Sequence, residues 1–149
     1  MTDDTEYMQM ALKQAELAAQ AGEVPVGAVL VLENGQVFSS NNAPISRHDA
    51  SAHAEMRVIR AACAATQNYR LVGSSLYVTL EPCTMCAGCI IHARIGRLVY
   101  AASDPKTGAV KSLYQLLSDK RLNHQPQVTA SIMADESSRL LKQFFKHCR

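Results

Sequence analysis

The spacing of apolar residues predicts a helix at the start of the chain. From about residue 3 to residue 21, apolar side chains recur every three or four positions, as on a helix with one buried face. Asp3 followed by Glu6 resembles a capping box, and Gly22 is a suitable end. The predicted buried stripe holds Tyr7, Ala11, Ala15 and Ala18, with Met8, Leu12 and Ala19 beside it.

Apolar runs and turn residues then predict five strands. Residues 26–32 are almost wholly apolar, which suits a strand buried on both faces. Asn34 and Gly35 form a strong hairpin signal, so the returning strand is expected over 36–40. Further short strands are expected over 76–80, 97–101 and 128–132.

The stretches between these strands predict a loop and further helices. Residues 41–51 are polar and contain Pro44, which favours a loop. The helix expected over 52–65 would pack Met56, Ile59 and Cys63 inward. Other helices are expected over 83–93, 112–117 and 136–146. A hairpin followed by alternating strands and helices predicts an α/β fold with a mixed sheet, and leaves the strand order open.

Composition narrows the class of protein. The 149 residues, 48% of them hydrophobic, predict one domain over 1–149. No apolar run is long enough for a membrane span, and the acidic N-terminus lacks the layout of a signal peptide, so a cytoplasmic protein is expected. The net charge of +2 permits nucleic-acid binding without arguing for it. Five cysteines, an odd number, favour a metal or redox site over disulfides.

One His and two Cys have the spacing of a metal site. His53 is expected at the start of one helix, and Cys83 and Cys86 in the first turn of another, where thiolates are favoured. Three residues apart, the two Cys share one helix face. A catalytic zinc site takes three protein ligands and leaves a position for water. The pattern therefore predicts Zn²⁺ held by His53, Cys83 and Cys86.

Glu55 is the predicted catalytic residue. It lies two residues beyond His53, so it can stay unligated and move protons to and from an activated water, whose pKa at zinc is roughly 7. His-x-Glu followed by Pro-Cys-x-x-Cys is the signature of zinc deaminases. Two other interpretations stay open. A structural zinc site would need a fourth ligand such as Cys89 or His92, and a redox Cys pair would leave His53 idle.

At these motifs the chain resembles the bacterial tRNA adenosine deaminases of the cytidine deaminase-like superfamily. The likeness covers nearly the whole chain and includes Asn-Tyr-Arg-Leu at 68–71 and Leu-Tyr-Val-Thr-Leu-Glu-Pro-Cys at 76–83. The other matching stretches are 23–30, 47–49, 85–88, 94–97 and 106–109. The resemblance implies a three-layer α/β/α fold around a five-stranded mixed sheet, one zinc ion per subunit and a homodimer. The implied reaction is hydrolytic deamination of adenosine to inosine at the wobble position of a tRNA anticodon.

The resemblance also implies how the RNA is held. Asn42 would contact the flipped adenine, Asp104 would hold the ribose and backbone, and Asn123 would lie at the rim of the pocket. Phe144 and Phe145 match a pair found near the anticodon loop, although packing in the core would also explain them. Ala54 and Lys106 complete the implied substrate-binding set. The expected substrate is the anticodon stem-loop of an arginine tRNA with the anticodon ACG.

Two residues differ from some relatives in the expected RNA-binding loop, and two alternative functions stay open. Ser103 stands where some relatives carry Arg, and Pro105 stiffens the next loop. A deaminase of a free base or nucleoside, of the cytosine or guanine type, would use the same zinc site. A structural-zinc module that binds RNA without catalysis is the other alternative. Candidate phosphate contacts are Lys106, Lys111, Lys120, Arg121, Lys142, Lys146 and Arg149.

Overall fold

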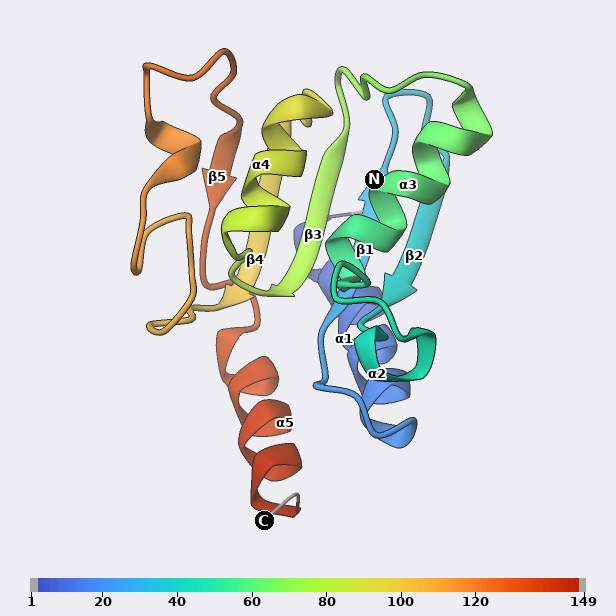
Figure 1. Cartoon of the computed structure of the whole chain (residues 1–149), viewed down its shortest axis with the longest axis vertical. Coiled ribbons are helices and arrows are strands. Elements are labelled where there is room, and N and C mark those ends of the chain that lie inside the picture. Colours follow the sequence, from blue (N-terminus) through green and yellow to red (C-terminus); the bar gives the residue numbers. More distant parts are fainter. Residues whose placement is uncertain (1–2, 148–149) are drawn as a thin grey trace.

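A five-stranded mixed sheet forms the centre of the molecule, which is a computed structural model that describes residues 3–147 (Figure 1). The strand order is β2-β1-β3-β4-β5. Strand β1 is antiparallel to both of its neighbours, whereas β3, β4 and β5 run parallel. The strands are β1 (Gly27–Val31), β2 (Val37–Asn41), β3 (Ser75–Leu80), β4 (Arg97–Ala102) and β5 (Gln127–Thr129).

Helices cover both faces of this sheet, which confirms the expected three-layer fold. Helices α3 (Ala54–Thr66) and α4 (Thr84–His92) pack on one face, and α1 (Asp4–Gln20) and α5 (Ala134–His147) contact the other. Two short elements, α2 (Pro44–Arg47) and the 3-10 helix η1 (Leu116–Ser118), lie in the connections. Within residues 3–147, no helix has both the length and the apolar content needed to cross a bilayer.

The two-residue period of the strands divides the apolar side chains into two cores. Leu76 and Val78 on β3 belong to the core under α3 and α4. Tyr77, which lies between them, belongs to the core under α1 and pairs in register with Val29 and Val99. Close packing of α1 on the sheet requires Gly27, because a Cβ there would collide with the backbone of α1. The sheet is thus buried on both faces.

The first helix agrees with the expectation, and α3 departs from it in detail. The Asp3 carboxylate accepts the Glu6 N–H at 3.0 Å, as a cap should. In α3 the core residues are Val58, Ile59 and Ala62, whereas Met56 and Cys63 are only half-buried. Cys63 nevertheless packs against the core under α3 and α4, whereas the prediction that Met56 packs inward was wrong, because Met56 lies at the edge of the buried stripe.

Three connections also differ from the expectation. The predicted loop 41–51 contains α2, which begins at Pro44, a favoured first helical residue. The helix expected over 112–117 is replaced by a turn and η1, because the N–H groups around Ser112 bond a side chain from elsewhere. Strand β5 ends at Thr129, and positive φ angles at Ser131 and Met133 stop it from continuing.

Candidate active site

Three metal-binding side chains meet at the ends of α3 and α4. His53 is the N-cap of α3, Cys83 is the N-cap of α4, and Cys86 lies in the first turn of α4. His53 Nδ1 lies 3.6 Å from Cys83 Sγ and 3.5 Å from Cys86 Sγ. All three ligand atoms lie within 4.8 Å of one another. One nitrogen and two sulfurs at this spacing suit a tetrahedral zinc ion with one position left open.

Neither residue considered as a fourth ligand joins this group. In the part of the chain that the structure describes, only His53, Cys83 and Cys86 form it. Cys89 is half-buried one turn further along α4, and His92 is exposed at the end of that helix. Cys148 lies outside the described residues. The geometry therefore has the open form of a catalytic site and lacks the four ligands of a structural one.

The pKa values of the two thiols shift in opposite directions. A hydrogen bond from Cys86 is the largest cause that lowers the pKa of Cys83, to about 4. The same hydrogen bond, with burial, raises the pKa of Cys86. His53 has a raised pKa, mainly because it is hydrogen-bonded to Cys83. Cys83 is therefore ready to bind a cation as a thiolate, and a metal ion would replace the proton that the pair retains.

Glu55 is a buried carboxyl group beside this cluster. It is only 4% exposed, although carboxylates rarely lie inside a protein without a partner. Burial is the largest cause that raises its pKa, to about 7. The neighbouring Cys86 thiol lowers that pKa in part. Its first-turn position on α3 directs it toward the same cavity as His53.

A cavity of about 270 Å³ brings the metal-binding group and Glu55 together with more distant segments. It lies where the carboxyl ends of β2, β3 and β4 meet, the edge at which open α/β sheets bind ligands. Figure 1 places the first turns of α3 and α4 at the lower end of the sheet. The cavity is lined by Val24, Val26, Asn42, Pro44, His53, Glu55, Leu80, Glu81, Cys83, Asp104 and Thr107.

Two polar residues expected to bind substrate line this cavity. Asn42 is nearly buried, and its side-chain amide donates to the Val24 carbonyl at 3.2 Å. Asp104 follows β4, and its carboxylate accepts the N–H groups of Lys106 and Thr107 at 3.1 and 3.2 Å. Hydrogen bonds thus hold both side chains in place, Asn42 to the segment before β1 and Asp104 to its own loop. The sequence placed them 62 positions apart, and the sheet brings them to one cavity.

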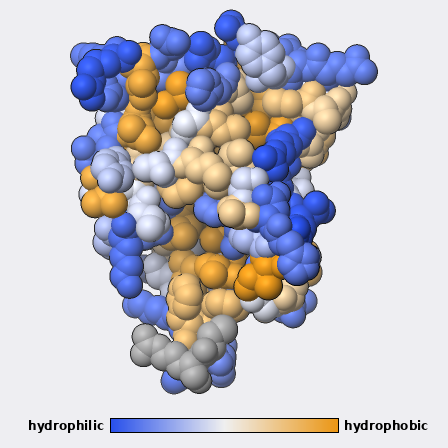
Figure 2. All heavy atoms as spheres, in the orientation of Figure 1, coloured by the Kyte–Doolittle hydropathy of each residue, from blue (hydrophilic) through white to orange (hydrophobic). Residues whose placement is uncertain are grey.

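The other predicted substrate contacts lie outside the lining. Ala54 is fully buried on α3, and Lys106 is exposed on the loop of Asp104. Asn123 is exposed at a separate hollow with His92. Phe144 is half-buried and Phe145 is 49% exposed, with ring centroids 5.5 Å apart, so neither is a fully buried core residue. In Figure 2, apolar side chains are visible along α5, at the lower end of the molecule.

Two buried carboxylates, one lining the cavity and one beside it, were not predicted from the sequence. Glu81 lines it directly, and Glu23 accepts the N–H groups of Ile45 and Ser46 at 3.2 and 2.7 Å. Burial alone would raise the pKa of Glu23, but these hydrogen bonds leave it lowered. The available signal in the sequence was a carboxylate within four residues of an apolar strand. In the structure each of the two is 2% exposed. Such a residue is unusual enough to be a candidate for a special role.

Comparison with known proteins agrees with this geometry. The family model of the MafB19-like deaminases matches residues 2–149. A tRNA-specific adenosine deaminase of Agrobacterium fabrum is 47% identical over all of this chain and 98% of that protein. A structure from a study of A-to-I editing by tRNA:A34 deaminases at the wobble position has a TM-score of 0.88 and 48% identity, and the match covers 92% of this chain and 99% of that one.

A guanine deaminase gives a weaker match. The Bacillus subtilis enzyme has a TM-score of 0.64 and 35% identity, over 69% of this chain and 66% of that one. Sequence identity over the full length therefore favours the tRNA enzymes over the free-base enzyme. The chain belongs to the MafB19-like deaminases, and within the cytidine deaminase-like superfamily to the family of tRNA-specific adenosine deaminases.

Proposed function

We propose that this protein hydrolyses adenosine to inosine at the wobble position of a tRNA anticodon and releases ammonia. One observation carries the proposal: an unligated, buried Glu55 shares a cavity with a three-residue zinc-binding group. A structural zinc site has no need of that carboxylate. The family relationship supports tRNA as the substrate class. Residues 1–149 would act as one deaminase domain.

His53, Cys83 and Cys86 would hold one zinc ion per subunit. The donor set fits, because zinc accepts nitrogen and thiolate ligands in tetrahedral geometry. When bound, the ion would act as a Lewis acid that lowers the pKa of water to about 7. Cys83, whose pKa is lowered, would bind without a large cost of deprotonation.

Glu55 would carry the protons of the reaction. It lies where it can accept a proton from the attacking water and deliver it to N1 of the adenine ring. After oxygen has bonded to C6, the hydroxyl proton would move through Glu55 to the exocyclic nitrogen, and the C–N bond breaks. Adenosine and water then become inosine and ammonia, and Glu55 returns to its starting state.

The size of the cavity supports a substrate presented as one base. A base in an anticodon loop is already unpaired, so turning it into a pocket costs less than extracting it from a duplex. Asn42 would then contact the base, and Asp104 the ribose and backbone. Ala54, Lys106, Asn123, Phe144 and Phe145 would complete the contacts. Exposed Lys111, Lys120, Lys142 and Lys146 offer charges for phosphates.

We further infer a homodimer and an arginine tRNA with the anticodon ACG as substrate. Leu113, Tyr114 and Leu122 are large apolar side chains that are 38% to 51% exposed, and a second copy of the chain would cover them. A tRNA substrate would place the protein in the cytoplasm. Deamination of a free base such as guanine is the second candidate, favoured by the partial match to guanine deaminase.

Inosine formation in the zinc-loaded protein tests the proposal. The substrates are an arginine tRNA stem-loop with the anticodon ACG, free guanine and free cytosine. We expect inosine at the wobble position and no turnover of the free bases. Turnover of guanine alone would transfer the function to the second candidate. A folded, zinc-loaded protein that binds the stem-loop without converting it would be the non-catalytic RNA module.

A further inference from the structure

Glu81 binds an unusual number of hydrogen-bond donors. It follows β3 directly and is 2% exposed. One carboxylate oxygen accepts the Asp104 N–H at 3.0 Å and the Ser112 hydroxyl. The other accepts the N–H groups of Val110, Lys111 and Ser112 at 3.0, 2.8 and 3.0 Å. Five donors therefore converge on two oxygen atoms.

These donors stand in for a cation. Among residues 3–147, Glu81 forms no ion pair with Lys or Arg. A carboxylate has about four lone-pair sites, and five donors occupy them fully. Glu81 therefore has no free acceptor for a substrate or a metal ion, although it lines the cavity.

The donors all come from one loop, 104–112, which carries part of the cavity wall. Asp104 and Thr107 both line the cavity. The Thr107 hydroxyl donates to the Asp104 carboxylate at 2.7 Å, and the Gly108 N–H donates to the Asp104 carbonyl at 2.8 Å. Gly108 packs directly on Glu81, where any Cβ would collide with the carboxylate. The loop is thus wound around Glu81.

We propose that Glu81 is a positioning residue that sets the place of Asp104 for substrate binding. The inference rests on the proposed function, because Asp104 is taken to hold the RNA near the target nucleotide. Glu81 lies two residues before Cys83, at the rigid end of β3. It therefore fixes the substrate loop to the same strand end that leads into the metal-binding helix. The Asp104 carboxylate and the zinc ligands thereby keep one relative geometry.

Glu81→Gln tests this with nearly the same side-chain volume. The amide puts an NH₂ donor against backbone N–H donors, so the loop must move away from it. We expect zinc content to remain at one per chain and KM for the stem-loop to rise about tenfold, while kcat changes much less. Exposed Glu16→Gln on α1 is the matched control and should behave as wild type. Loss of folded protein alone would lower kcat and leave KM unchanged, which would overturn the proposal.

A double-mutant cycle with Asp104→Ala separates positioning from general stability. If Glu81 acts through Asp104, then Glu81→Gln should raise KM by less than about twofold in the Asp104→Ala background. An equal factor in both backgrounds would show that Glu81 does not act through Asp104. Ser112→Ala removes one of the five donors and should raise KM in the same direction, by less than Glu81→Gln. If Glu81→Gln does not fold, an unchanged KM for Ser112→Ala would overturn the proposal.

Amide hydrogen exchange gives a readout that does not need the reaction. In Glu81→Gln, the N–H groups of Val110, Lys111 and Ser112 should exchange faster than in wild type, while those in the core of β3 stay protected. Unchanged exchange in these three groups would refute the anchoring itself. If wild type makes no inosine but exchange rises as expected, the proposed function fails and the anchoring remains.

Discussion

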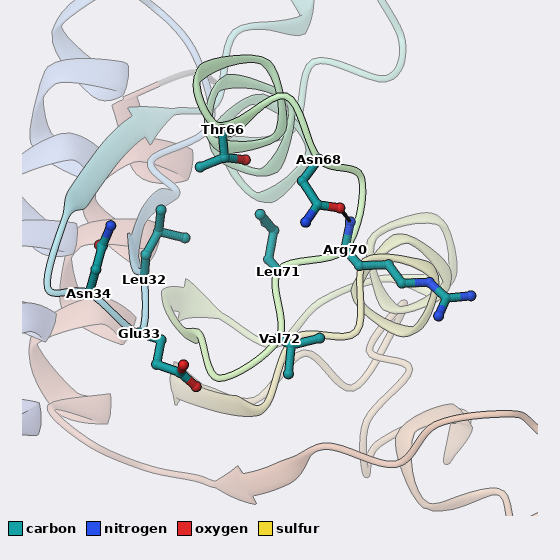
Figure 3. Close-up of a pocket in the computed structure, with 8 residues that line it drawn as sticks. All are labelled: Leu32, Glu33, Asn34, Thr66, Asn68, Arg70, Leu71 and Val72. Carbon is teal, nitrogen blue, oxygen red and sulfur yellow. Dashed lines mark hydrogen bonds between the residues drawn. The ribbon is translucent and has the colours of Figure 1, made fainter.

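Two hollows lie at opposite ends of the sheet, and the smaller one contains the metal-binding group. The larger, about 470 Å³, lies between the turn after β1 and the segment that follows α3 (Figure 3). Its polar groups bond to their own backbone: Asn68 accepts the Arg70 N–H at 3.0 Å, and the Thr66 hydroxyl donates to the Ala62 carbonyl at 2.8 Å. Figure 3 shows the Arg70 guanidinium pointing away from the hollow.

The contrast shows that convergence of reactive groups identifies a site better than size does. The cavity of about 270 Å³ gathers a metal-binding group and buried carboxyl groups at the carboxyl ends of β2, β3 and β4. Glu55 and Glu81 are almost fully buried there, whereas Glu33 at the larger hollow is exposed. Burying the Glu55 carboxyl group costs stability, as its raised pKa indicates, and this points to a role in function.

The largest expected effect is that of Cys83→Ala. Removing one of three zinc ligands should reduce zinc from one per chain to almost none and abolish inosine formation. Cys63→Ala, a half-buried thiol on α3, is the control and should keep zinc and turnover at a stability cost of about 1 kcal/mol. Zinc analysis and inosine assays on the two variants measure this. Undiminished zinc in Cys83→Ala would refute the ligand assignment.

Low pH should destabilise the protein by protonating Glu81, which lines the cavity. Its pKa is about 2 in the folded protein, below the ordinary value of 4.5. Its stabilisation is therefore complete above pH 4.5 and is lost as the pH falls from 4.5 through about 2. Thermal unfolding of wild type and Glu81→Gln across this range measures the effect. As the pH falls below 4.5, the melting temperature of wild type should decrease more steeply than that of Glu81→Gln. Parallel curves of melting temperature against pH would contradict the lowered pKa of Glu81.

A pair of Asn variants compares the two hollows directly. Asn42→Ala should lower kcat/KM for the stem-loop about tenfold, the scale of one lost hydrogen bond, with zinc unchanged. Asn68→Ala at the larger hollow should leave kcat/KM as in wild type. Steady-state kinetics on both variants decide between the hollows. Equal losses of kcat/KM in Asn42→Ala and Asn68→Ala would show that the two hollows do not differ in their role in the reaction.

The smallest effect is expected at Glu33. The side chain is exposed beside the larger hollow, so Glu33→Gln should change the free energy of unfolding by no more than about 0.5 kcal/mol. Chemical denaturation and an inosine assay measure both properties. A clear loss of turnover would show that the larger hollow takes part in the reaction.

Much of the fold could be predicted because periodicity is a local property. The apolar run at 26–32, the turn at Asn34 and Gly35, and the stripe on α1 each carry their own signal. The prediction of a helix over 112–117 failed, because the N–H groups of Lys111 and Ser112, where that helix would begin, bond to Glu81, which lies about 30 positions earlier. No local pattern contains such a partner. The strand order likewise depends on contacts between distant segments.

In the site, too, some residues could be predicted from the sequence and others depend on contacts between distant segments. His53, Glu55, Cys83 and Cys86 could be predicted together, because metal chemistry restricts both residue type and spacing. Family resemblance supplied Asn42 and Asp104, and the sheet places both at the cavity. The anchoring role of Glu81 could not be predicted. Its partners are backbone N–H groups, which leave no mark on residue type.

The most direct test is the zinc content and inosine yield of Glu55→Ala, measured beside Glu33→Ala. We expect Glu55→Ala to keep one zinc per chain and to lose turnover by about 100-fold or more, the scale of a general acid–base group. Glu33→Ala should match wild type in both measurements. A Glu55→Ala protein that still forms inosine at the wild-type rate would show that this buried carboxyl group does not move the protons of the reaction.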